Sequence, residues 1–111
     1  GYEVKSAADV ILVNGIIGNL LALLQAQQAG YEVPAHILVD AAASLSSALA
    51  NPDDLNNAYE VDRQIFFLYV LHLTGEDVPV LYDRHVAETR DLMSPYAKAL
   101  LAVIYADTGF T

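Results

Sequence analysis

Apolar positions along the chain follow two alternating patterns. In residues 7–24 and 65–73 almost every position is apolar, whereas in residues 34–50 and 78–91 apolar residues recur every three or four positions. The second pattern is typical of an amphipathic α-helix. Residues 65–73 contain the aromatic and β-branched side chains that strands favour, but the length of this segment and the glycine at position 75 favour a buried helix. We therefore predict an all-α fold.

Glycine and proline separate the apolar segments at two similar places. Residues 30–34 (Gly-Tyr-Glu-Val-Pro) and 75–79 (Gly-Glu-Asp-Val-Pro) share the form Gly-x-acid-Val-Pro. Glycine ends a helix because it adopts the left-handed conformation without a Cβ clash, and proline fits the first turn of the next helix. Each place therefore predicts a helix end, a turn and a new helix. Gly109 predicts one further helix end.

These signals predict about five helices that pair into α/α hairpins. Ser6 is the expected N-cap of the first helix, and Ser94 followed by Pro95 is the clearest helix start in the chain. A polar turn at residues 51–54 separates the second helix from the third. The expected bounds of the helices are residues 6–29, 34–50, 55–74, 78–91 and 94–108.

The polarity of these helices predicts how they are layered. The first, third and fifth are apolar on nearly all sides, whereas the second and fourth each keep a polar side. Because a helix without a polar side is enclosed by other helices, we expect an inner layer of enclosed helices and an outer layer that faces water. Helical hairpins layered in this way stack into a solenoid or close into an α/α toroid. We predict a single helical domain, residues 1–111, that is part of a larger α/α toroid.

Composition narrows the classes of partner. A net charge of −9, with only five lysines and arginines, argues against nucleic acid and against an anionic membrane surface, both of which require clustered cations. Membrane insertion of residues 7–24 is disfavoured by Asp9, Asn14 and Asn19 inside the segment. The absence of cysteine excludes disulfides, thiolate metal sites and cysteine nucleophiles. Gly15 and Gly18 indicate either a close approach of two helices or glycines tolerated in a buried helix.

Three segments resemble the helical, thioester-containing domain of bacterial alpha-2-macroglobulins. Residues 29–34 (Ala-Gly-Tyr-Glu-Val-Pro) resemble a turn between two helices of that domain, and residues 67–75 resemble the inner helix that follows. Residues 92–102 (Leu-Met-Ser-Pro-Tyr-Ala-Lys-Ala-Leu-Leu-Ala) resemble its hairpin of leucine, serine, proline and an alanine- and leucine-rich run. These segments occur in the family's order.

This resemblance implies an architecture and a setting. The family's domain is an α/α toroid within large extracellular or periplasmic protease inhibitors, which trap attacking proteases. The expected partners are therefore the remaining domains of the parent chain and, through the full-length protein, target proteases. Active members couple to the protease through a thioester formed by a Cys-Gly-Glu-Gln motif. No residue here inherits that role, because the chain has no cysteine.

Histidines are the first candidates for metal or proton chemistry. His85 and Glu88 stand three residues apart on one predicted helix, a spacing that suits a metal ion. Such a site needs a second pair on a facing helix, and neither His36 nor His72 has a carboxylate three residues away. We therefore predict that His85 and Glu88 lie on a solvated helix face. His72 is predicted to be a hydrogen-bonded core or edge residue and not a catalytic base.

Acidic residues are the second candidates. Asp53, Asp54, Glu60 and Asp62 cluster near a helix start. Toroidal terpene cyclases use acidic motifs to donate protons or to hold magnesium diphosphate, but there the aspartates face a cavity with aromatic walls. Here the acids fall in a turn and the first helical turn, where capping and the helix dipole account for them.

Serines offer no clear nucleophile, since Ser44, Ser46 and Ser47 lack a G-x-S-x-G elbow and a suitably placed histidine. We predict no catalytic, cofactor-binding or metal-binding residue, no cofactor and no enzymatic activity. The leading hypothesis is a non-enzymatic scaffold and interaction segment of a bacterial alpha-2-macroglobulin-like protease-trapping inhibitor. The alternatives are a fragment of an α/α-toroid enzyme of the terpene-cyclase or glycosidase type, or a free-standing helical protein-interaction module. The isolated segment is expected to self-associate into a homo-oligomer, because helices cut from a larger array expose apolar faces.

Overall fold

The computed structural model describes the backbone of residues 7–109, and side chains from residue 17 onward. This part of the chain contains five α-helices and two short 3₁₀ helices, and it has no strand, which confirms the predicted all-α fold. The predicted N-cap at Ser6 and the polar residues Asp9 and Asn14 lie outside the described side chains. The elements are α1 (Ala7–Gln28), α2 (Ala35–Ser46), η1 (Pro52–Asp54), α3 (Ala58–Leu73), α4 (Pro79–Glu88), η2 (Arg90–Leu92) and α5 (Pro95–Thr108).

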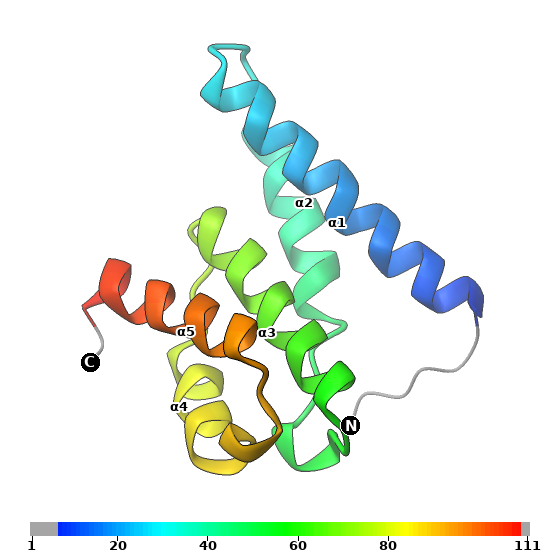
Figure 1. The fold of residues 1–111 in the computed structure, drawn as a ribbon. Helices are drawn as coiled ribbons and strands as arrows, with labels where there is room; N and C mark the ends of the chain where they lie inside the picture. Colours follow the sequence, from blue (N-terminus) through cyan, green and yellow to red (C-terminus); the bar gives the residue numbers. More distant parts are fainter. Residues whose placement is uncertain (1–6, 110–111) are drawn as a thin grey trace.

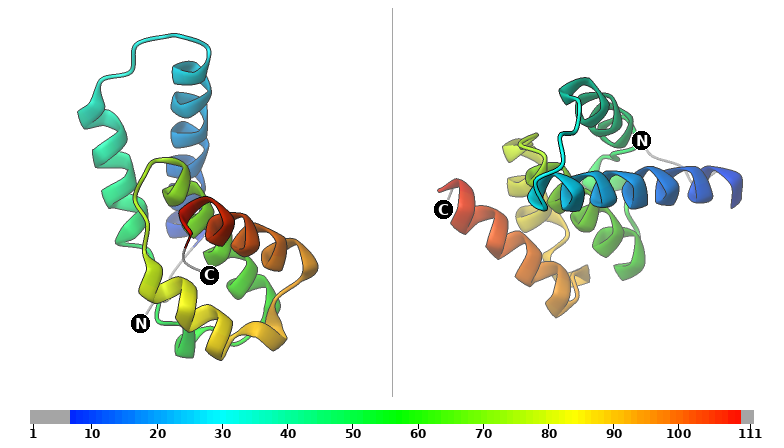
Figure 2. Two further views of the ribbon diagram at one scale, coloured as in Figure 1. Left: turned by 90° about the vertical axis from the view of Figure 1, so that its left-hand side faces the viewer. Right: turned by 90° about the horizontal axis from the view of Figure 1, so that it is seen from above.

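Helix α3 occupies the middle of the molecule. Helices α1 and α2 form an antiparallel hairpin on one side of it, and α5 runs beside it on the other side (Figure 1). Helix α4 follows α3 and packs near η1 and η2 (Figure 2). The N-terminal part of α1 extends beyond α2 and α3, both in the view of Figure 1 and from above in Figure 2.

Two hydrophobic clusters form the core, and α3 contributes to both. Val61, Ile65 and Leu68 face the first cluster, and Phe67, Val70 and Leu71 face the second. The remaining buried members of the first cluster are Ala50, Leu55, Tyr82, Met93, Ala97, Leu101 and Ile104. Those of the second are Ile17, Leu20, Ala42 and Leu45. A helix that packs on two sides needs apolar residues on both, which explains the nearly continuous apolar run in residues 65–73.

The predicted glycine stops are confirmed. Gly30, Gly75 and Gly109 have φ angles of +95°, +89° and +74°, in the left-handed region that a Cβ atom disfavours. After α1, the amide of Tyr31 donates to the carbonyl of Ala26, and after α3 the amide of Glu76 donates to the carbonyl of Leu71. In each case the amide donates across the helix end to the carbonyl five residues earlier, as in a Schellman motif. The two similar turns in the sequence thus have the same backbone hydrogen bonding.

The predicted start of the last helix is also confirmed. Ser94 Oγ accepts a hydrogen bond from the amide of Ala97 at 3.2 Å, and Pro95 is the first residue of α5. Pro79 is likewise the first residue of α4, whereas Pro34 precedes α2 as its N-cap residue.

Three predicted helix bounds were too long, and at two of them a side chain takes over backbone hydrogen bonds. Helix α2 ends at Ser46 and not near residue 50, because the side chain of Gln64 bonds both backbone groups of Ala50. Helix α3 begins at Ala58 because Asn57 Oδ1 accepts from the amide of Glu60. Helix α4 ends at Glu88, and a separate 3₁₀ turn, η2, occupies residues 90–92.

Among the described side chains, the predicted enclosure is found for most of α3 and not for α5. Helix α5 buries Ala97, Leu101 and Ile104, but Tyr96 and Val103 on the same helix are 59% and 44% exposed. Gly18 in α1 is exposed, and a Cβ atom there would meet nothing within 4 Å, so it does not serve a close helix approach within this chain. Closure into an α/α toroid stays a prediction.

Candidate functional site

The most polar tertiary cluster surrounds His72, near the C-terminal end of α3. His72 Nδ1 lies 2.7 Å from Asp77 Oδ1, in the turn before α4, and Nε2 lies 3.0 Å from Asp107 Oδ2, near the end of α5. The hydroxyl of Tyr82 donates to the same oxygen of Asp77 at 2.8 Å. One imidazole ring therefore joins the ends of α3 and α5 to the turn that follows α3. The prediction of a hydrogen-bonded edge histidine is confirmed.

Both ring nitrogens of His72 face carboxylate oxygens, and both can donate only when the ring is protonated. Burial lowers the pKa of His72, but the hydrogen bonds to Asp107 and Asp77 and the charges of these two carboxylates together outweigh burial, so that the pKa is raised above 6.5. The resulting cation also lies near the negative end of the α3 dipole. His72 is therefore a clamp between two carboxylates, and both of its ring nitrogens are engaged.

A second histidine, His85 on α4, is fully buried and electrically neutral. Gln64 Nε2 donates to His85 Nε2 at 3.0 Å and to the carbonyl of Ala50 at 2.8 Å, and the amide of Ala50 donates to Gln64 Oε1 at 2.7 Å. Because His85 Nε2 accepts a hydrogen bond, its proton resides on Nδ1, which donates to Thr89 Oγ1 at 2.9 Å. Thr89 in turn donates to the carbonyl of His85. Burial, with a smaller contribution from the charge of Arg84, lowers the pKa of His85 to about 4.

The predicted exposure of His85 was wrong, and the reason is tertiary. His85 is 0% exposed because Gln64, on a different helix, offers it a hydrogen bond inside the core. Glu88 points elsewhere: it forms the predicted pair with Arg84, at 3.1 Å. His36 is exposed on α2. Among the residues whose side chains are described, no three histidine, aspartate or glutamate side chains are arranged to hold a metal ion.

The acidic cluster near the start of α3 is divided among separate partners. Asp53 pairs with Arg84 at 3.3 Å, Glu60 accepts from the amide of Asn56 at 2.9 Å, and Asp62 accepts from the amide of Ser94 at 3.1 Å. Capping explains Glu60, as predicted. Asp62 has a role that the sequence did not reveal, because its partner is 32 residues away.

Serine side chains on α2 bond the local backbone. Ser44 Oγ donates to the carbonyl of Asp40 at 3.1 Å, and Ser47 Oγ donates to the carbonyl of Ser44 at 2.7 Å. These bonds lie within one helix and its end, and they bring neither hydroxyl to a histidine.

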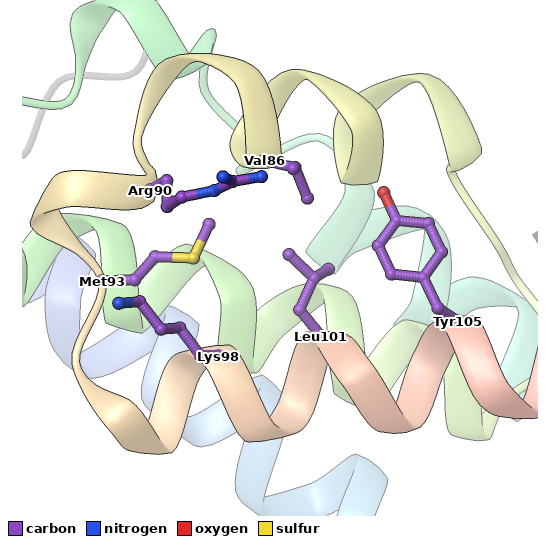
Figure 3. Close-up of a pocket in the computed structure, with 6 residues that line it drawn as sticks. All are labelled: Val86, Arg90, Met93, Lys98, Leu101 and Tyr105. Carbon is purple, nitrogen blue, oxygen red and sulfur yellow. The ribbon is translucent and has the colours of Figure 1, made fainter. Parts of the chain in front are cut away.

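Two concave sites were not predicted. A groove on the first hairpin, with a volume of about 460 Å³, is lined by Asn19, Ala22, Leu23, Ile37 and Ala41. A pocket of about 250 Å³ opens between α4, η2 and α5, and is lined by Val86, Arg90, Met93, Lys98, Leu101 and Tyr105 (Figure 3). Neither set follows a sequence motif, because the helix packing brings the residues together.

Comparison with known proteins does not assign the chain. No family model, curated protein or solved structure matches it. The resemblance to bacterial alpha-2-macroglobulins therefore stays a prediction. Among the described residues, no helix combines the length and the apolar character needed to cross a bilayer.

His85 should make the chain less stable in acid. Its pKa is about 4 in the fold and 6.5 when unfolded, so the unfolded state binds the proton first and stability falls between pH 6.5 and 4. In urea titrations, the free energy of unfolding of the parent minus that of His85→Gln should shrink by up to about 3 kcal/mol between pH 7 and 4. His36→Gln, which removes an exposed histidine, is the control. An NMR titration of His85 near pH 6.5 would contradict the buried neutral ring.

His72 should act in the opposite direction. Its pKa is raised in the fold, so its contribution to stability is complete below pH 6.5 and is lost as the pH rises through the folded-state value. The difference in unfolding free energy between the parent and His72→Gln should therefore be largest in mild acid. Asp107→Asn, which removes one of the two carboxylates, should bring the pKa of His72 partly back toward 6.5, as measured by NMR. A difference that stays constant from pH 6 to 9 would refute the clamp.

Proposed function

We propose that the chain is a non-catalytic helical scaffold and interaction segment of a protease-trapping inhibitor similar to bacterial alpha-2-macroglobulins. The observation that carries this proposal is the apolar groove on the first hairpin. Among the described residues that line it, Ala22, Leu23, Ile37 and Ala41 are apolar, and Ile37 is 38% exposed. The polar groups that would otherwise suggest chemistry, His72 and His85, are committed to contacts between helices.

The occupant that suits this groove is a neighbouring helical hairpin of the same protein. Helix α3 already packs on the α1–α2 hairpin through apolar contacts, which shows how a helix docks on this unit. The groove lies between α1 and α2, and the N-terminal part of α1 extends beyond both α2 and α3 (Figure 1). A further hairpin there would continue the packing that the repeated turns begin. In this arrangement the segment provides a contact surface for neighbouring hairpins and for the remaining domains of the protein. The proposal places that protein outside the cytoplasm.

The enzyme alternative requires carboxylates that converge on a cavity. In the described residues, the acids near the start of α3 turn toward different backbone and side-chain partners. The groove and the pocket are lined by apolar, amide, basic and tyrosine side chains, without a described carboxylate. These arrangements support the scaffold hypothesis over the cyclase-type one.

Self-association of the isolated chain tests the groove. Sedimentation equilibrium should show association that increases with concentration, because the open apolar surface gains by burial. Ile37→Glu, which places a charge at the groove, should shift the chain toward monomer. Val80→Glu on α4 is the matched control, since Val80 is apolar, 71% exposed and not among the groove residues. A strict monomer at millimolar concentration would contradict an open docking surface.

Protease trapping tests the function itself. The protein that carries this segment should be incubated with trypsin, and hydrolysis of a large protein substrate and of a short peptide substrate should be followed. Trapping encloses the protease sterically, so cleavage of the protein substrate should fall while cleavage of the peptide persists. Ile37→Glu should weaken this protection, and Val80→Glu should not. Unchanged cleavage of both substrates, or equal loss of both, would overturn the proposal.

A further inference from the structure

Helix α5 presents a second apolar face to solvent. Ala97, Leu101 and Ile104 bury one side of the helix against the first core cluster. Residues on the opposite side are exposed and uncharged, and we call them the outer face of α5: Pro95, Tyr96, Ala99, Ala102, Val103 and Ala106. Tyr96 and Val103 are 59% and 44% exposed. Exposed apolar surface that is contiguous in this way is typical of a site where another chain or element docks.

The register of α5 relative to α3 indicates what covers such a face. A Thr-Gly pair marks the end of each helix, which aligns the two helices residue by residue. Val70, by which α3 packs on the α1–α2 hairpin, then corresponds to Ile104, by which α5 packs on α3. Ile65, which lies in the cluster that α5 covers, corresponds to Ala99 on the outer face. The outer face of α5 is thus equivalent to the face of α3 on which the next helix packs.

The first-hairpin groove is also a place where a helix is expected. It is continuous with the contact between this hairpin and α3, because Ala41 lines the groove and also packs against the second core cluster. The two Gly-x-acid-Val-Pro turns align the first hairpin with the second. Leu23 in the groove then corresponds to Leu68, and Ile37 corresponds to Tyr82. Leu68 and Tyr82 are fully buried in the cluster that α5 covers, so the groove holds the positions that receive a helix on the second hairpin.

We propose that copies of this chain associate head to tail, with the outer face of α5 of one copy in the first-hairpin groove of the next. The ridge of a single helix fits a groove, whereas two grooves that face each other would both stay unfilled. The described residues of both surfaces are uncharged, so chains of net charge −9 meet there with the least repulsion.

The place of the two surfaces in the fold determines the kind of assembly. The α1–α2 hairpin and α5 lie on opposite sides of α3 (Figure 1), so one copy can contact a neighbour through each surface at the same time. Such contacts join different surfaces of identical chains, and they continue from copy to copy unless a ring closes. This inference rests on the proposed role of the groove as a helix-docking surface, and it names the surface that fills the groove.

Sedimentation velocity of mixed variants tests the pairing. Ile37→Glu blocks the groove and Ala99→Glu blocks the outer face of α5, so each variant alone should be monomeric at a concentration where the parent chain associates. Mixed in equal amounts, the two variants should form a dimer, because one keeps its outer face and the other keeps its groove. This dimer should not grow, since each of its two remaining surfaces carries a glutamate. Association of the parent chain should strengthen with added salt, which screens the repulsion between copies.

Val80→Glu is the matched control, because Val80 is an exposed apolar residue of α4 outside both surfaces, and this variant should associate as the parent chain does. Val103→Glu is a second block of the outer face and should behave as Ala99→Glu does. Circular dichroism establishes that each variant is folded. The pairing is overturned if both α5 variants associate as the parent does, or if the mixture stays monomeric. Loss of association in Ile37→Glu alone would overturn the role of α5 and still support the groove, so the two proposals fail separately.

Discussion

Helix α3 is packed on two sides, and each side joins it to a different part of the molecule. Val61, Ile65 and Leu68 lie against the first cluster with α4 and α5, and Phe67, Val70 and Leu71 lie against the α1–α2 hairpin. Each fully buried side chain of this size contributes about 1.5–3 kcal/mol by leaving water. Without α3, neither group of helices would keep its core, because the two clusters share no other element to the same extent.

Polar side chains inside this core form hydrogen bonds between helices. Gln64 replaces the helical hydrogen bonds of Ala50 and also reaches His85, so that one side chain joins the end of the α2 segment, α3 and α4. An unsatisfied buried donor or acceptor costs about 1–3 kcal/mol, which makes this network specific for one arrangement. At the rim, His72 performs a similar task with charge, between Asp77 and Asp107. The two histidines therefore respond to pH in opposite directions, although both hold helices together.

The two concave sites differ in the side chains that line them. The first hairpin offers an apolar groove, whereas the opposite end of the chain offers a pocket whose lining includes Arg90 and Lys98.

The sequence by itself determined the helices and their order, because the stops at Gly30 and Gly75 and the cap at Ser94 act within a few residues. It also indicated the burial of most of residues 65–71, although Leu73 is 42% exposed, and the hydrogen bonding of His72. It did not determine the end of α2, the burial of His85, or the two concave sites. These depend on Gln64, on the approach of α4 to α3 and to α5, and on the packing of α1 on α2, which join residues far apart in the chain. Local propensity acts over one helical turn, whereas a buried hydrogen bond or a pocket exists only once distant helices have packed.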